Sequence, residues 1–448
     1  MGKRAALETL GCKVNQYEST HFLETLTDAG YELTDFRECA DLYIVHGCTV
    51  TSRAGYQTRQ LLRRARRINP SATIVVAGCA AQLEADRLAV EGLATHILGN
   101  SAKFDLLSWI DSPGAFSSPC MAVADPRLCQ ACTPLPVSRM LSGRARALLK
   151  VQDGCDAFCT YCVVPLVRGK SRSLSGEHVR AQMDRFLGSG YREIVLTGIH
   201  LGQWGKDLQP QQDLSDLLVH LSEGPLPARI RLSSLEPMEC NARLMELLCT
   251  RHWICPHFHV PLQSGDEEVL KRMARPYTPR QYSEIVRELH RLRPIAAIGA
   301  DVMACFPGET ERQFENTCQL IESLPLAYLH VFPFSPRPGT AAARWNVRIE
   351  GSEIKRRTHT LHQIGSRKRQ AFLHRSLGTN AEVLVETRLD GDWWQGTSEN
   401  YIPVVFRSSK PLSPGLLVSV RLTNLTGKAA TGELLSSPSQ EQVQDGPA

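Results

Sequence analysis

The feature that most constrains this chain is a group of three cysteines inside one short segment. Cys155, Cys159 and Cys162 form a CxxxCxxC pattern within residues 150–173, KVQDGCDAFCTYCVVPLVRGKSRS. This spacing places three thiolates within one short loop, close enough to bind one metal centre, and no fourth cysteine or histidine follows nearby. Because an iron–sulfur cluster normally takes four cysteine ligands, the loop predicts one iron whose last ligand is solvent or substrate.

The same segment resembles the signature of radical S-adenosylmethionine (SAM) enzymes. The resemblance implies a [4Fe-4S] cluster on Cys155, Cys159 and Cys162, with SAM chelating the open iron through its amino and carboxylate groups. Tyr161 stands where that family usually has an aromatic residue. A structural zinc loop is the competing interpretation. Zinc sites of that kind usually combine two CxxC pairs or a CxxC with HxxxH, and neither arrangement occurs in this segment.

Length and composition indicate a folded protein of several domains. A chain of 448 residues predicts two to three domains, and 42% hydrophobic with 22% charged residues is ordinary for a soluble protein. We expect no membrane span, because no apolar run approaches the required length, and no secretory signal at MGKRAALETLGC. A cytoplasmic location is therefore expected, where fifteen cysteines indicate metal sites or buried thiols rather than disulfides. The net charge of +5 only weakly indicates a polyanionic partner.

The first third of the chain alternates short apolar runs with helical patterns. The expected elements are strands at residues 5–10, 42–45 and 73–77, with helices at residues 18–29 and 54–68 between them. This βαβαβ order predicts an open parallel sheet with right-handed crossovers.

A second group of cysteines follows these strands. Cys12, Cys48 and Cys79 each come just after one strand, and each has a glycine directly before it. Because the carboxyl ends of parallel strands share one ligand-binding edge, we expect the three thiols to converge. The glycines allow a tight turn or a close approach to a bulky cluster. Three buried, chemically idle cysteines are the weaker alternative.

This segment resembles the N-terminal domain of the methylthiotransferases, and TLGCKVNQYEST is close to the branch that acts on threonylcarbamoyladenosine in tRNA. The resemblance implies a second [4Fe-4S] cluster with an open iron on Cys12, Cys48 and Cys79. One departure is His46-Gly47, where the family usually has Asn-Thr before the second cysteine. Such a change could alter the potential or lability of the cluster without removing a ligand.

A basic run lies within the first third. Residues 53–67 contain no acidic residue and six arginines, which are Arg53, Arg59, Arg63, Arg64, Arg66 and Arg67. On a helix most of them point away from the buried stripe. A solvated basic face and a track for RNA phosphates are both open interpretations.

Residues 113–140 change in character. Prolines and small residues with little periodicity predict a linker between domains. The linker contains Cys120, Cys129 and Cys132, including a CxxC. With no matching pair nearby, we interpret these as incidental thiols rather than as a third metal site.

The middle of the chain shows six strand–helix units. The expected strands lie at residues 148–152, 193–197, 229–233, 257–261, 298–303 and 328–332. Six units fall short of the eight that close a full barrel. The pattern therefore predicts a partial (β/α)6 barrel that stays open on one side, which suits a macromolecular substrate.

Candidate SAM-binding residues follow these strands, at the end where barrels place functional groups. By resemblance, the motifs RLSSLEP, HVPLQSGDEEVLKRMARPYT, IGADVMACFPGETE and FPFSPRPGT look like the SAM-binding and substrate-facing motifs of the methylthiotransferases. The candidates are Thr197, His200, Ser233, Ser234, Glu236, Gln263 and Asp301. Taken singly, each could instead be a cap or turn residue.

Four further residues near these motifs have open roles. Cys305 stands where the family usually has glycine and is interpreted as a packing variant. Arg168, Lys170 and Arg172 follow the cysteine loop and could pair with the SAM carboxylate or with RNA phosphate. Solvated loop charges are the alternative for these three.

The last part of the chain predicts a helix at residues 352–377 and then short strands. These strands, at residues 381–387, 401–406, 416–422 and 430–435, suggest a small closed barrel that binds nucleic acid. The segment resembles a TRAM domain, an RNA-binding barrel. Its aromatic residues could stack on bases or pack the core; they are Trp393, Trp394, Tyr401 and Phe406. Residues 437–448 are polar and expected to be disordered.

Nearly the whole chain thus resembles a radical SAM methylthiotransferase of the threonylcarbamoyladenosine branch. The predicted fold is α/β, with an open parallel sheet, a partial barrel and a small β barrel. The predicted parts are an N-terminal domain at residues 1–112, a linker at 113–140, a radical SAM core at 141–370, a TRAM domain at 373–436 and a tail at 437–448.

The resemblance also implies a mechanism. One SAM would methylate a sulfur held on the first cluster, and a second SAM on the other cluster would be split to a 5′-deoxyadenosyl radical. That radical would take hydrogen from the adenine C2 next to the anticodon, and the carbon would take up methylsulfide. Because this C–H bond offers no useful acidity, no side chain is expected to act by acid–base catalysis.

The expected partners are the tRNA anticodon loop, an electron donor and a sulfur source. The sequence identifies neither the donor nor the source, and it predicts no oligomeric state. Sibling enzymes that methylthiolate isopentenyladenosine or a ribosomal-protein aspartate are alternatives, against which KVNQYES and RGKSRS argue. From other classes, a non-enzymatic RNA-binding zinc protein and a metabolic redox carrier stay open.

Overall fold

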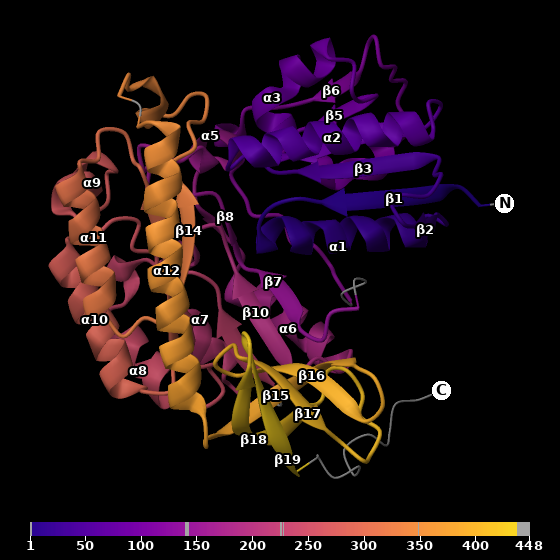
Figure 1. Cartoon of the computed structure of the whole chain (residues 1–448). Coiled ribbons are helices and arrows are strands. Elements are labelled where there is room, and N and C mark those ends of the chain that lie inside the picture. Colours follow the sequence, from indigo (N-terminus) through magenta and orange to yellow (C-terminus); the bar gives the residue numbers. More distant parts are fainter. Residues whose placement is uncertain (1, 139–142, 225, 227, 348, 437–448) are drawn as a thin grey trace.

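The computed structural model of the chain describes residues 2–138, 143–224, 226, 228–347 and 349–436. Figure 1 shows an N-terminal α/β unit, a central set of strands with helices along its outer side, and a small C-terminal β barrel. This arrangement confirms the predicted fold class. The tail predicted to be disordered, residues 437–448, lies outside the described residues.

The N-terminal sheet has six parallel strands in the order β2-β1-β3-β4-β5-β6. The strands that the sequence predicted are β1 (Arg4–Thr9), β3 (Leu42–Gly47) and β4 (Thr73–Gly78). The helices that follow them are α1 (Lys13–Asp28), α2 (Ser52–Ile68) and α3 (Cys79–Val90). The additional strands β2 (Glu32–Thr34), β5 (His96–Leu98) and β6 (Cys120–Ala122) have three residues each, too few for a readable pattern.

Helix α1 begins five residues earlier than the apolar pattern predicts. Its first two turns bury polar side chains, among them Asn15 and Glu18. The apolar periodicity therefore does not indicate where the helix starts. Cys12 is the residue directly before the helix.

Residues 113–138, the described part of the predicted linker, contain a strand and several buried positions. Strand β6 lies within it and pairs in parallel with β5, so that His96 faces Cys120. Cys132, Leu135 and Val137 from the same segment are buried in the core of the central domain. The prolines of this stretch prevent long regular elements, yet short apolar positions between them still find a sheet edge and a core.

The central domain contains six parallel strands in chain order, as predicted. They are β7 (Ala147–Lys150), β10 (Glu193–Thr197), β11 (Arg229–Leu232), β12 (His257–His259), β13 (Ala297–Ala304) and β14 (Tyr328–Pro333). β7, β10 and β11 pair, as do β12, β13 and β14, and a parallel bridge between Ser234 and His259 joins the halves. No pairing joins β7 to β14 in the described part of the chain, so the barrel is partial.

Helices cover the outside of this barrel. They are α6 (Gly176–Gly188), α7 (Leu214–Leu221), α8 (Ala242–Thr250), α9 (Glu267–Arg272), α10 (Pro279–Leu292) and α11 (Glu311–Ser323). The long helix α12 (Gly351–Ser376) runs beside β14 and leads to the C-terminal barrel (Figure 1). Among the described helices, none is both long and apolar enough to traverse a lipid bilayer.

The predicted cysteine loop is closed at its base by a short antiparallel pair. β8 (Gln152–Asp153) and β9 (Arg172–Ser173) form this pair, and helix α5 (Val164–Arg168) lies between them. Gly154 has a φ of +75°, and a Cβ there would lie 1.8 Å from the carbonyl oxygen of Lys170. Only glycine fits this start of the loop.

The C-terminal strands close into a five-stranded barrel in the order β15-β16-β17-β19-β18. They are β15 (Asn380–Arg388), β16 (Trp393–Ser398), β17 (Pro403–Arg407), β18 (Leu417–Thr426) and β19 (Ala429–Ser436). Trp394 and Phe406 are buried in its core, whereas Tyr401 is 39% exposed. β16 was not predicted, because Gly396 interrupts the β pattern where it approaches the carbonyl oxygen of Leu384.

This small barrel is fixed to the amino ends of the central strands by buried charges. Glu193 of β10 pairs with Arg229 and Arg231 of β11 at 2.7 and 2.8 Å. Arg229 donates to the carbonyl oxygen of Glu382 at 2.6 Å, and Arg231 donates to that of Glu399 at 2.9 Å. The C-terminal barrel therefore covers one end of the central barrel.

Candidate active site

Hydrogen-bonding groups lie against two cysteines of the CxxxCxxC loop, Cys155 and Cys159. The backbone N–H of Ala157 donates to the Cys155 Sγ at 3.4 Å, and the His200 Nδ1 lies 3.3 Å from that sulfur. Arg275 donates from Nη1 to the Cys159 Sγ at 3.3 Å. Donors directed at sulfur stabilise thiolates and set the potential of a cluster that the thiolates hold.

Burial has the opposite effect to these donors, because it raises the pKa of the thiols. It raises the pKa of Cys155 to about 12 and that of Cys162 to about 11. Both thiols therefore hold their protons at neutral pH until a metal replaces them. Loading of this loop must release protons.

The other three cysteines converge at the carboxyl edge of the N-terminal sheet. Cys12 precedes α1, Cys48 follows β3 and Cys79 opens α3. A Cβ on Gly11 would lie 2.9 Å from the Cys48 Sγ, so the glycine before the first cysteine gives room to the second. Burial, together with the neighbouring Cys79 and Cys12, raises the pKa of Cys48 to about 11. The structure thus brings together the three thiols that the sequence singled out.

The thiols of neither set lie as close together as the ligand atoms of a compact metal site. In the described part of the chain, only His259, Asp301 and His330 place three metal-binding atoms within 4.8 Å of one another. Neither cysteine set is this compact, whereas tetrahedral zinc with bonds of about 2.3 Å would hold its sulfurs closer than that. Three thiols with donors directed at sulfur fit the ligands of an iron–sulfur cluster.

Arg168 connects the two cysteine sets. It lies at the end of α5, just after the CxxxCxxC loop, yet its Nε donates to the Cys79 Sγ at 3.3 Å. Its Nη1 donates to Asp153 at 2.8 Å and its Nη2 to Asn15 at 2.6 Å. Val163, the residue after Cys162, also packs against Cys79. The two sets are therefore neighbours across the boundary between the first two domains.

Arg168 is not one of the solvated loop charges that the sequence left open. Its side chain is 1% exposed and shares the Glu18 carboxylate with Lys103 and Lys150, at distances of 2.6 to 3.1 Å. These cations hold the pKa of Glu18 well below its usual range despite its burial. Arg172 is buried as well, whereas Lys170 is exposed.

His46 lies beside the same carboxylate, although its Nε2 makes no hydrogen bond there. Its Nε2 lies 3.5 Å from Glu18, its Nδ1 lies 2.8 Å from the Ser19 hydroxyl, and its ring fills the space beside Gly78. Burial and the nearby Lys103 hold the pKa of His46 well below its usual value. The residue supports the turn before Cys79 rather than offering a further ligand.

The candidate SAM-binding residues have different surroundings. Thr197 is buried at the end of β10, and the His200 Nε2 is 2.5 Å from Glu239. Glu236 forms an ion pair with Arg275, which itself contacts Cys159. Ser234 is exposed. Their role in binding SAM stays a prediction.

Besides the His200 Nε2, which lies against Glu239, two candidates have buried polar atoms without a hydrogen bond in the protein. These atoms are the Ser233 Oγ and the Gln263 Oε1. Gln263 also has a φ of +64°, an unfavourable backbone conformation for a residue with a side chain. Because buried polar groups are normally hydrogen-bonded, these atoms fit a site completed by a ligand.

Asp301 is held by two histidines, His259 and His330, that are not among the predicted site residues. The His259 Nε2 lies 3.0 Å and the His330 Nδ1 3.2 Å from its carboxylate. These contacts hold the pKa of Asp301 well below its usual value, although burial opposes them. The alternation along β12 and β14 could have indicated that both histidines point to the side of Asp301.

Cys305 has a φ of +63° and is buried, with its N–H donating to Glu309 at 2.9 Å. This conformation explains why glycine suits the position and agrees with a packing role. Cys132 lies in the central core, where burial raises its pKa to about 11, and Cys120 lies on β6.

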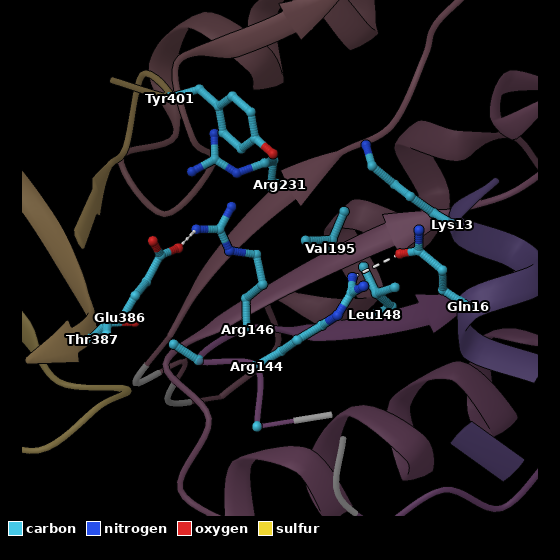
Figure 2. Close-up of a pocket in the computed structure, with 12 residues that line it drawn as sticks. Lys13, Gln16, Arg144, Arg146, Leu148, Val195, Arg231, Glu386, Thr387 and Tyr401 are labelled. Atoms are coloured by element: carbon cyan, nitrogen blue, oxygen red, sulfur yellow. Dashed lines mark hydrogen bonds and ion pairs between the residues drawn. The ribbon is translucent and has the colours of Figure 1, made fainter. Parts of the chain in front are cut away.

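A cavity of about 510 Å³ lies where the first domain, the central barrel and the C-terminal barrel meet (Figure 2). Its charged lining consists of Lys13, Arg144, Arg146, Arg231 and Glu386. Leu148 and Val195 form its apolar wall. Tyr401 covers the Arg231 guanidinium, with 4.9 Å between the guanidinium carbon and the ring centre. The charged lining is thus predominantly cationic. The cavity lies next to Cys12, because Lys13, the following residue, is part of the lining.

Part of the basic run on α2 is used within the protein. Arg59 pairs with Glu84 at 2.6 Å, Arg63 pairs with Glu91 at 2.9 Å, and Arg66 donates to the carbonyl oxygen of Gly92 at 2.7 Å. Arg53 and Arg67 are exposed. Fewer arginines of α2 are therefore available to contact RNA phosphates than the sequence suggests.

Comparisons with known proteins agree with this architecture. Residues 4–99 match the model of the uncharacterized protein family UPF0004, and residues 149–321 match that of the radical SAM superfamily. The fold resembles the radical SAM methyltransferase TsrM from Kitasatospora setae, with a TM-score of 0.54, 16% identity and 77% of each chain covered. At this identity the likeness shows the fold alone.

Closer relatives cover nearly the whole chain. The threonylcarbamoyladenosine tRNA methylthiotransferase MtaB of Bacillus subtilis is 35% identical over 93% of each chain. The proteins of that name from Aquifex aeolicus and Thermotoga maritima are each 34% identical, over 90% and 95% of this chain and 96% and 95% of their own. The chain therefore belongs to the MtaB family of radical SAM methylthiotransferases.

Proposed function

We propose that this protein methylthiolates C2 of N6-threonylcarbamoyladenosine next to the anticodon of tRNA. The relatives that share its full length carry this activity in their names. The proposal includes two SAM molecules and two [4Fe-4S] clusters, one on Cys12, Cys48 and Cys79 and one on Cys155, Cys159 and Cys162. It also keeps the predicted domains at residues 1–112, 141–370 and 373–436, with β6 added to the first sheet.

The observation that carries the proposal is that Cys79 of the first cysteine set contacts residues that directly follow the second set. Arg168 follows the second set and donates to Cys79 of the first, and Val163 packs against the same cysteine. A nucleobase that reacts with groups bound to both cysteine sets requires the two sets to lie close to the same substrate position. When bound, the clusters and SAM supply the one-electron and methylthio-group chemistry, for which the side chains have no substitute.

The residues of the chain bind, orient and exclude water. Arg275 directs a donor at Cys159, the His200 Nδ1 lies beside Cys155, and the buried Ser233 and Gln263 atoms offer partners to SAM. The core of Val163, Val167 and Leu83 beside Cys79 keeps water from the space between the sets. Holding the reactants in place in this way replaces the acid–base chemistry that the C–H bond does not permit.

The C-terminal barrel would hold the tRNA outside the cavity. It is the TRAM-like part of the chain, and its Trp393 stays partly exposed beside Arg407, with 4.7 Å between the guanidinium and the ring centre. Aromatic and cationic groups side by side suit stacking on single-stranded RNA. A tRNA substrate also supports the expected cytoplasmic location of the protein.

Nucleoside profiling tests the proposal. In tRNA from cells that lack the protein, the mass spectrum should show threonylcarbamoyladenosine without its 2-methylthio derivative, and the gene should restore it. Genes for Cys79→Ala and Cys159→Ala should fail to restore it, whereas Cys120→Ala on β6 should succeed. A lost 2-methylthio signal on isopentenyladenosine, or on a ribosomal-protein aspartate, would replace the proposal with a sibling activity.

The two non-sibling alternatives are separated by simpler assays. Anaerobic iron analysis of the reconstituted protein should give about eight irons per chain for two clusters, whereas a zinc protein would contain zinc. A redox carrier would hold clusters but would not cleave SAM when reduced. Reductive SAM cleavage therefore distinguishes the proposed enzyme from the carrier.

A further inference from the structure

We propose that Lys13 and Arg144 recognise the threonyl carboxylate of the substrate nucleoside, an inference that rests on the proposed function. Both residues line the cavity of about 510 Å³ shown in Figure 2. Lys13 belongs to the first turn of α1, directly after Cys12, and Arg144 precedes β7. The two cations come from different domains and face one space.

The other two cations of the cavity are already neutralised. Arg146 pairs with Glu386, and Arg231 donates from Nε to Glu193 at 2.8 Å. Within the described residues, neither Lys13 nor Arg144 has a carboxylate at ion-pair distance; Arg144 donates only to the neutral Gln16 Oε1, at 2.7 Å. In Figure 2, the Lys13 ammonium points away from its helix into the cavity. Two unpaired cations beside a partly apolar wall provide a receptor for an anion.

The geometry of adenine favours the carboxylate as that anion. C2 and the N6 substituent lie on the same edge of the base, on either side of N1, whereas the ribose and its phosphates are attached at N9. When C2 faces the cysteine sets, the threonylcarbamoyl group enters the protein with it. The phosphates stay on the outer side of the base. Of the two anions in the substrate, the carboxylate therefore reaches a cavity that adjoins Cys12.

The cavity suits the rest of this group as well. Thr387 and Gln16 offer polar partners for the urea and hydroxyl groups of the threonylcarbamoyl side chain, and Leu148 and Val195 offer an apolar surface to its methyl group. An isopentenyl group has no charge to place between Lys13 and Arg144. The same residues would therefore exclude that substrate, because its binding would leave two cations desolvated and unpaired.

The test measures binding of anticodon stem-loop RNAs to the reconstituted enzyme. One RNA carries threonylcarbamoyladenosine, and a second carries its methyl ester, which removes only the negative charge. Wild type should bind the acid at least about tenfold more tightly than the ester, the size expected for charge-assisted hydrogen bonds. In Lys13→Met and Arg144→Gln this ratio should fall towards one, and Lys13→Arg should retain most of it.

Lys206→Met is the matched control, because this exposed lysine lies outside the cavity lining. It should leave the ratio of acid to ester unchanged. Because Lys13 adjoins Cys12, the iron content of every variant is measured, and Arg144→Gln tests the proposal without altering that neighbour.

The outcomes separate the inference from the proposed function. If wild type modifies the acid RNA but binds acid and ester equally, the carboxylate receptor is wrong and the function stands. If Lys13→Met and Arg144→Gln weaken both RNAs by the same factor, the two cations contact phosphate and the inference is overturned. If wild type modifies no threonylcarbamoyladenosine RNA, both fail.

Discussion

At the scale of single residues, Arg168 is the side chain on which the junction of the first two domains depends. Replacement by methionine keeps much of its volume but leaves Glu18 and Asp153 with one cation fewer in a buried site. Breaking such a network by removing one partner costs about 3–5 kcal/mol. We expect Arg168→Met to lower the melting temperature of the metal-free chain clearly and to reduce the iron retained by the first cysteine set.

Arg280→Met provides the comparison for this variant. Arg280 is 89% exposed and pairs with Glu284 on the surface of α10, so its loss should change stability by at most about 1 kcal/mol. Arg168→Lys keeps the charge without the planar fork and should fall between wild type and Arg168→Met. If Arg168→Met has the same melting temperature as wild type, the network around Arg168 makes no contribution to stability.

At the scale of elements, the cysteine loop depends on the way β8 and β9 meet at its base. In Gly154→Ala, the new Cβ would lie 1.8 Å from the carbonyl oxygen of Lys170 and would require a φ of +75°. The two strands must move apart, and the three thiols that follow lose their arrangement. We expect the variant to keep one cluster and contain about four irons per chain instead of about eight.

Gly188→Ala is the corresponding change in a place that tolerates it. Gly188 ends α6 with no atom within 4 Å of an added Cβ, so alanine should be neutral or slightly stabilising. Its iron content should equal that of wild type. Full iron content in Gly154→Ala would mean that the loop assembles without the β8–β9 closure.

At the scale of the whole molecule, Glu193 joins the central and C-terminal barrels through three arginines. Arg231, Arg229 and Arg146 hold its pKa well below the usual 4.5 despite burial. Because the folded-state pKa is the lower one, the stabilisation is complete above pH 4.5 and is lost as the pH falls below it. Each pH unit below that point should remove about 1.4 kcal/mol.

Melting curves of wild type and Glu193→Gln test this dependence, since the comparison removes the effect of all other carboxylates. At neutral pH wild type should melt well above the variant, and the gap should narrow steadily in acid. Glu268→Gln, with a surface carboxylate that is 68% exposed, should give no such trend. A gap that stays constant in acid would show that Glu193 is not the group that titrates.

The sequence predicted those features that depend on local pattern. The convergence of Cys12, Cys48 and Cys79, the strands that these cysteines follow and the chain order of the central barrel could be predicted, because glycine–cysteine turns and apolar runs are visible in short windows. The buried charges could not, since Lys150 and Arg168 look like ordinary basic residues until Glu18 from another domain is placed beside them. Strands β5 and β6 were missed because their stability comes from pairing rather than from length.

The same limit applies to the cavity. Its lining comes from Lys13, Arg144, Arg231 and Tyr401, which are far apart in the chain and have no common motif. Their convergence depends on how three domains dock, and that docking depends on pairs such as Arg231 with the carbonyl oxygen of Glu399. Long-range contacts of this kind leave no periodic trace in the sequence.

Glu386, Thr387 and Tyr401 give the C-terminal barrel a share of the cavity wall. The barrel is therefore more than a handle for holding RNA, and it cannot be exchanged as an independent module. A chimera that received this barrel from an enzyme acting on another nucleoside would inherit part of that enzyme's discrimination between substrates. Evolution of new targets in this architecture would require matched changes in the C-terminal barrel and in the domains that form the rest of the cavity wall.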